Sequence, residues 1–205
     1  MNETSKISKD NSTWVTLEVP LAPDALLAFL KNTERLFRLN PYLDISMWEG
    51  RPEGMQHHLE ALNEMNGVLY HLDLDLESQG NRHFFLRYSQ GLKASLEVAV
   101  EAASDSNQAI LTLREHYHQV SIATQEQQLK EIDHSLIPWG KAIVVYIRGM
   151  QRWGWFWPYR WYQEKFWLGM RPTHRRIARL ITWVTLLEFV VFLFVFIIYF
   201  LEFLR

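Results

Sequence analysis

Apolar and polar residues alternate along most of the chain between residues 14 and 118, which is typical of strands with one buried face and one solvated face. In residues 14–19, for example, Val15, Leu17 and Val19 share one side. The alternation recurs over residues 42–49, 56–65, 68–78, 84–88, 92–100 and 109–118. The pair Asn66-Gly67 is a strong hairpin signal between two of these segments. The pattern predicts seven antiparallel strands, the last six of them consecutive.

Two regions follow a helical period instead. Pro23 and Asp24 suit the first turn of a helix, and two short helices are expected before Asn40-Pro41, because proline disfavours helical geometry in the residue before it. After a polar segment at 121–135, Pro138 is expected to open a longer helix. One face of this helix carries Trp139, Ile143, Tyr146, Ile147 and Met150. We expect this face to cover the apolar side of the sheet.

The composition excludes several classes of protein. The 205 residues are 48% hydrophobic and 21% charged with a net charge of −2, unlike a disordered chain or a dedicated nucleic-acid binder. Without cysteine, the chain has no disulfide, no thiolate nucleophile and no cysteine-based metal site.

Charge and hydropathy divide the chain into zones. Residues 1–150 hold 13 Lys/Arg and 20 Asp/Glu, whereas residues 151–179 hold seven Lys/Arg and one Glu. We expect four parts: a disordered N-terminus at 1–12, a folded domain at 13–152, an aromatic and basic interface segment at 153–179, and a transmembrane helix at 180–204. The last part has no Gly or Pro and would reach roughly 37 Å as a helix, more than the ~30 Å hydrocarbon core of a bilayer.

The interface segment predicts how the protein meets the membrane. Nine of the 15 residues from Trp153 to Trp167 are aromatic, and such rings favour the headgroup level. The residues expected at this level are Trp153, Trp155, Trp157, Trp161, Trp167, Arg171, Arg175 and Arg176. The excess of arginine before the span places the N-terminal domain in the cytoplasm of a single-pass, tail-anchored protein, and the polar first 13 residues show no signal peptide.

The order of elements resembles a known superfamily. One strand, two helices ending in Leu36-Phe37-Arg38-Leu39-Asn40-Pro41, six strands and a long helix are similar to the START-like, or SRPBCC, helix-grip fold. That group includes lipid-transfer domains and polyketide cyclases. The resemblance covers residues 13–152 and implies an α+β helix-grip domain (β-α-α-β6-α), in which a seven-stranded antiparallel curved sheet wraps around the C-terminal helix. The C-terminal transmembrane helix is an addition to it.

The resemblance also implies an apolar cavity between sheet and helix. Its expected lining is Tyr70, Leu72, Leu74, Arg87, Leu113, Glu115, Tyr117, Ile143, Tyr146 and Ile147. Alternation alone does not distinguish a filled core from a ligand cavity. Arg87, Arg114 and Glu115 either orient a polar ligand head or form cross-strand pairs on the wet face.

Signals for catalysis and metals are weak. Neither the eight histidines nor Asp133-His134-Ser135 has the spacing of a metal site or a catalytic triad, so we expect no metal and no cofactor. Glu188 is an ionisable residue within the predicted span. Three roles stay open for its carboxyl group: reaching the membrane interface, accepting a hydrogen bond from a partner helix, or taking part in proton or ion chemistry.

The sequence therefore predicts a membrane-tethered domain that binds a hydrophobic small molecule, such as a lipid, quinone, isoprenoid or polyketide-like compound. Its expected partners are membrane lipids, this ligand and an integral-membrane protein, with no nucleic acid. Two alternatives stay open. One is an enzyme of the polyketide cyclase or dehydratase type, although a binding role fits the residues better. The other is an accessory or assembly subunit of a membrane complex, which would have an empty or collapsed cavity.

Overall fold

The computed structural model of the chain describes residues 6–7, 12–50, 55–105, 107–118 and 135–204. The chain divides into two compact units, Met1–Gly169 and Met170–Arg205. The described residues do not include residues 1–5 and 8–11 of the expected disordered N-terminus. They also leave out residues 121–134 of the expected polar segment at 121–135, and with them the pair Asp133-His134.

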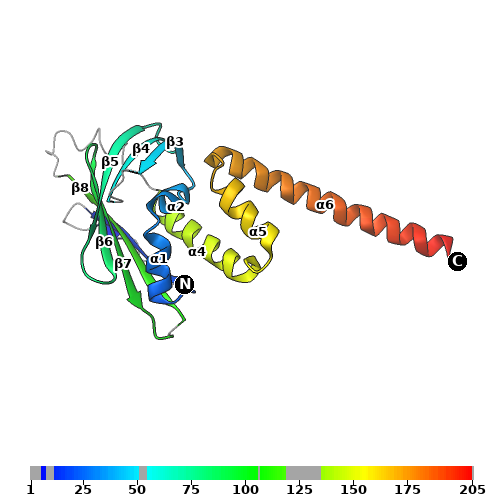
Figure 1. Cartoon of the computed structure of the whole chain (residues 1–205). Coiled ribbons are helices and arrows are strands. Elements are labelled where there is room, and N and C mark those ends of the chain that lie inside the picture. Colours follow the sequence, from blue (N-terminus) through cyan, green and yellow to red (C-terminus); the bar gives the residue numbers. More distant parts are fainter. Residues whose placement is uncertain (1–5, 8–11, 51–54, 106, 119–134, 205) are drawn as a thin grey trace. The chain divides into compact units, whose positions relative to one another are not determined.

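The first unit is built on one antiparallel sheet with the strand order β1-β2-β8-β7-β6-β5-β4-β3. The strands are β1 (Lys6–Ile7), β2 (Ser12–Val19), β3 (Leu43–Gly50), β4 (Gln56–Asn63), β5 (Leu69–Ser78), β6 (His83–Tyr88), β7 (Lys93–Ala102) and β8 (Ala109–Tyr117). The seven predicted strands are confirmed, and they form the curved sheet seen in Figure 1. The two residues of β1, which pair with β2, are too few to leave a periodic signal.

Short turns connect β4 to β5, β5 to β6 and β6 to β7. Gly67, Gly80 and Gly91 have positive φ angles of 74°, 78° and 96°, a conformation that glycine adopts without steric cost. At the predicted hairpin, the Asn66 side chain accepts a hydrogen bond from the Val68 amide at 3.1 Å. The Asn66-Gly67 turn between β4 and β5 is thus confirmed.

Three helices lie on one side of the sheet: α1 (Pro23–Leu30), α2 (Thr33–Arg38) and α4 (Leu136–Trp153). Asn32 caps α2 by accepting a hydrogen bond from the Arg35 amide at 3.0 Å. Helix α4 begins two residues before Pro138 rather than at it. Proline is tolerated there because the first amides of a helix have no partner within the helix.

Polar side chains join α4 to the end of α2. The Trp139 indole donates to the Leu36 carbonyl at 2.8 Å, and the Asn40 amide donates to the Ser135 hydroxyl at 3.2 Å. Asn40 also accepts from the Tyr42 amide at 3.0 Å. The Asn-Pro pair therefore ends α2, as predicted, and also anchors the start of α4.

The core lies between these helices and the inner face of the sheet, where the alternating apolar residues meet. Trp139 and Ile143 of α4 are almost fully buried there, together with Phe84 of β6. Gly140 lets α4 approach β2 closely, because a Cβ at this position would overlap Leu17 Cδ1 and lie 3.3 Å from Val15 Cγ1.

Two register shifts interrupt the alternation, one between Ile45 and Met47 in β3 and one between Lys93 and Ser95 in β7. Strict alternation puts Lys93 on the wet face with Ser95 and Glu97. The bulge instead pairs Lys93 with Tyr117, so that its side chain turns to the inner face. Alternation alone therefore misplaces Lys93.

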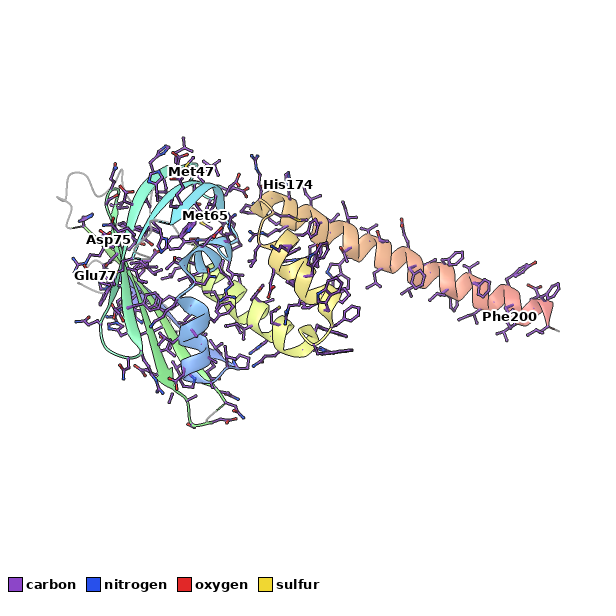
Figure 2. The ribbon with its side chains drawn as sticks, in the orientation of Figure 1. Met47, Met65, Asp75, Glu77, His174 and Phe200 are labelled. Carbon is purple, nitrogen blue, oxygen red and sulfur yellow. The ribbon has the colours of Figure 1, made fainter. Side chains whose placement is uncertain are left out.

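The chain continues from α4 into α5 (Trp157–Trp161) and the π-helix η1 (Tyr162–Trp167), which still belong to the first unit. The second unit is dominated by the single helix α6 (Pro172–Phe203). Figure 2 marks His174 near its beginning and Phe200 near its end. Within the described residues, α6 is the one helix long and apolar enough to cross a membrane.

Candidate functional site

A pocket of about 40 Å³ opens between the inner face of the sheet and the helices α2 and α4. Most of its wall is apolar or aromatic. The lining residues are Phe37, Asn40, Leu43, Leu59, Tyr70, Leu72, Tyr88, Gln90, Gly91, Leu92, Lys93, Glu115 and Trp139. This volume holds a few water molecules but not a lipid, since pockets for drug-sized ligands measure roughly 300–1,000 Å³.

A second depression, of about 210 Å³, shares part of this wall. It lies between the start of β5 at Val68–Leu72 and the turn Gln90–Leu92. The two hollows have Tyr70, Leu72 and the turn in common. Since β6 pairs with β5 only from Leu74 onward, the start of β5 lacks β6 as a neighbour on that side. The second depression lies where β6 is missing beside β5, and the inner pocket adjoins it through the shared residues.

A buried ion pair is the polar feature of the pocket. Lys93 Nζ donates to Glu115 Oε1 at 2.6 Å, with 14% of the Lys93 side chain exposed and none of Glu115. The Tyr117 hydroxyl donates to Glu115 Oε2 at 3.0 Å, and the Thr13 hydroxyl lies 3.3 Å from the Tyr117 oxygen. A carboxylate this deep needs such partners, because removing a charge from water costs several kcal/mol.

The hydroxyls of Tyr88 and Tyr117 stay protonated. Burial raises the pKa of Tyr88 well above its usual value, although the nearby Lys93 ammonium opposes the shift. Burial also raises the pKa of Tyr117, and the Glu115 carboxylate adds to this effect. Both hydroxyls therefore remain hydrogen-bond donors at physiological pH.

The expected lining residues separate into three groups. Tyr70, Leu72 and Glu115 line the pocket, and Tyr117 supports Glu115 from beside it. Five others pack in the core: Leu74, Leu113, Ile143, Tyr146 and Ile147. Arg87 lies on the opposite face of the sheet, where its Nε contacts Glu77 Oε2 at 2.8 Å with both side chains exposed.

Glu115, Arg87 and Arg114, for which two orientations stay open in the sequence, point in different directions. Glu115 faces the interior, whereas Arg87 and Arg114 face outward. Arg114 Nη1 lies 3.8 Å from Glu97 Oε2, and its guanidinium lies over the Trp14 ring at 5.5 Å. Of these three residues, only Glu115 lines the pocket and could contact a ligand there.

Sequence reasoning missed several pocket residues. Lys93 is missed because its bulge breaks the alternation, and Asn40 because the Asn-Pro pair was interpreted only as a helix end. Tyr88 could have been found, since it shares the inner face of β6 with Phe84 and Leu86.

Histidines gather on the outer face instead. His83 and His116 each contact one oxygen of Glu97 through Nε2, at 2.8 and 2.7 Å. Burial works against ionisation of Glu97, but these hydrogen bonds outweigh it and lower the pKa of Glu97. Among the described residues, no group of three acidic or histidine side chains is arranged to hold a metal ion.

Comparison with solved structures identifies the architecture. A START superfamily protein from Mycobacterium smegmatis is similar with a TM-score of 0.51 and 14% identity, over 68% of this chain and 98% of that one. The protein XoxI from Bacillus cereus gives 0.51 and 17% over 68% and 97%. The fold is START-like. It is a helix-grip domain with a curved antiparallel sheet and a long C-terminal helix.

The same comparison includes an uncharacterised protein from Bacillus thuringiensis, with a TM-score of 0.50 and 15% identity over 66% of this chain and 98% of that one. No protein-family profile and no curated protein sequence matches the chain. These likenesses establish the fold alone.

Proposed function

We propose that this chain is a membrane-tethered START-like protein that binds a hydrophobic small molecule with a neutral polar head, for transfer or presentation at the bilayer. The observation that carries the proposal is the buried Lys93–Glu115 pair in the wall of a mostly apolar and aromatic pocket. The helix α6 supplies the tether, and the arginines that precede its apolar part favour a cytoplasmic domain.

The charge of the site selects the kind of head. Lys93 is already neutralised by Glu115, so an anionic head would bring a second negative charge close to a buried carboxylate. A carbonyl or hydroxyl oxygen accepts hydrogen bonds from Lys93 or Tyr88 without that repulsion. Quinone, isoprenoid alcohol and polyketide-like ligands meet this requirement better than fatty acids do.

The size of the hollows limits how the ligand sits. In our proposal the polar head enters the inner pocket, and the apolar body occupies the larger depression beside Tyr70 and the Gln90–Leu92 turn. Larger ligands require this turn to move outward. Gly91 of this turn has a positive φ, and a Cβ atom there would have open space around it.

A second candidate function is an accessory subunit of a membrane complex. The small volume of the inner pocket favours it, because a scaffold has no need of an open cavity. It predicts that the purified protein carries a stable protein partner and no small molecule.

The deciding experiment is native mass spectrometry of the full-length protein in mild detergent, followed by organic extraction of bound molecules. We expect one co-purifying neutral hydrophobic species. It should be lost from the double variant Lys93→Met/Glu115→Leu, which removes both buried charges together and so preserves the fold. The matched control is Glu97→Gln on the outer face of the same sheet, which should retain it. A second polypeptide without a small molecule would overturn the carrier function.

A further inference from the structure

The segment after α4 exposes an unusual number of aromatic rings. Trp155 is 79% exposed and Trp157 is 68% exposed, and nearly half of the Trp153, Trp161 and Phe166 side chains face solvent. The rings touch one another without being covered: Trp157 stacks on Trp161 at 6.3 Å, and Trp161 meets Phe166 edge-on at 4.8 Å. Contiguous exposed apolar surface of this kind marks an interaction site.

This aromatic segment is held in place by the domain. Tyr159 of α5 lies against Gly149 of α4, where a Cβ would come within 2.5 Å of the Tyr159 hydroxyl. Burial raises the pKa of Tyr159, in agreement with this packing. The side of α5 that carries Tyr159 thus packs on α4, while Trp157 and Trp161 remain uncovered.

The chemistry of the segment fits a bilayer surface. Indole and phenol rings combine an apolar body with a polar edge, which suits the headgroup level of a membrane. Arg152, Arg160 and Lys165 are interleaved with the rings and exposed, and residues 151–179 contain only Glu164 as a negative charge. Basic groups so placed attract anionic lipid headgroups.

The connection to α6 limits how far the segment lies from the membrane. Only residues 168–171 separate the end of η1 from the start of α6, which allows at most about 18 Å of extended chain. The apolar run begins at Leu180, some 12 Å along the helix from Pro172. The headgroup region fills the layer just outside the hydrocarbon core, so the chain keeps the aromatic segment within reach of it.

We propose that the α5–η1 segment is a second, interfacial membrane contact, in which Trp155, Trp157 and Trp161 insert among the lipid headgroups. This inference rests on the membrane anchoring by α6 in the proposed function, and it adds a contact that holds the folded domain to the lipid surface. A bilayer suits it better than a partner protein, because the basic residues are spread among the rings and only four residues of chain separate the segment from α6.

The absence of cysteine from the chain allows single-site labelling. The variants Trp155→Cys and Trp157→Cys, each carrying an environment-sensitive fluorophore, report on the segment. Phe192→Cys reports on the middle of the apolar part of α6. Asp75→Cys is the matched aqueous control, since Asp75 is exposed on the side of the sheet away from the helices (Figure 2). Each full-length protein is reconstituted into vesicles of phosphatidylcholine and phosphatidylglycerol that carry a nitroxide either at the headgroup or in mid-chain.

The headgroup nitroxide should quench the labels at 155 and 157 several-fold more strongly than the label at 75, and the mid-chain nitroxide should quench the label at 192. Suppose that the mid-chain nitroxide quenches the label at 192, but the headgroup nitroxide quenches the labels at 155 and 157 no more than the label at 75. The interfacial contact is then overturned while the anchor stands. If the mid-chain nitroxide does not quench the label at 192, the membrane anchoring by α6 in the proposed function fails as well. Two labelled positions guard against a local effect of either substitution.

Discussion

Glu115 and Glu97 lie on the neighbouring strands β8 and β7 but face opposite sides of the same sheet. Glu115 is completely buried and paired with Lys93 and Tyr117, whereas 17% of the Glu97 side chain is exposed beside His83 and His116. Both carboxylates are satisfied. They differ in what replaces a lost partner: bulk solvent reaches Glu97, whereas Glu115 has no exposed surface and lines a pocket with room for only a few water molecules. The inner face should therefore tolerate far less change than the outer face.

The largest effect is expected for Lys93→Ala. This change leaves Glu115 as an uncompensated charge in the interior, which should lower the free energy of unfolding by about 3–5 kcal/mol. Denaturant unfolding of the full-length protein in detergent measures it. The double variant Lys93→Met/Glu115→Leu should recover most of this loss, and a double variant as unstable as the single one would contradict the explanation.

The next effect concerns packing on the same inner face. In Gly140→Ala the new methyl group overlaps Cδ1 of Leu17 in β2, so that the Leu17 side chain or α4 must shift. We expect a loss of about 1–3 kcal/mol, which is the usual cost of overpacking a core. Thermal unfolding measures it, and Ala142→Gly on the same helix is a useful control for helix propensity alone. An unchanged free energy of unfolding for Gly140→Ala would show that the Leu17 side chain or α4 shifts at little cost.

On the outer face, Glu97→Gln should cost about 1–3 kcal/mol near neutral pH, because it removes charge-assisted hydrogen bonds to two histidines. Since the pKa of Glu97 in the folded protein lies below its ordinary value of 4.5, the carboxylate stabilises the fold above that pH. The contribution disappears as the pH falls through the folded-state pKa. Urea unfolding of both proteins should show their difference shrinking in acid, and a constant difference would refute this account.

The smallest effect is expected for Arg87→Ala. The Arg87–Glu77 pair is exposed on both sides, and such pairs contribute about 0–1 kcal/mol. The variant should unfold nearly like the wild type and keep any bound ligand. A loss as large as that of Lys93→Ala would mean that the two faces of the sheet do not differ as argued above.

Local patterns account for most of the fold. The hairpin at Asn66-Gly67, the helix end at Asn40-Pro41 and the apolar face of α4 all follow from rules that act over a few residues, and the structure confirms each of them. The candidate site follows less well. Tyr70, Leu72 and Glu115 were expected near a cavity and line the pocket, but Arg87 faces outward and five of the expected residues fill the core.

The order of strands and helices resembles the START-like superfamily, and the sequence by itself determined that order and the apolar run that makes α6 long enough to cross a bilayer. These features depend on periodicity and composition, which are properties of the chain alone. Only the tertiary structure decided that Lys93 meets Glu115, because one bulge in β7 reverses the direction of a side chain and alternation has no means of anticipating it. It also decided how much of the interior is filled, since that volume depends on how side chains distant in sequence pack together.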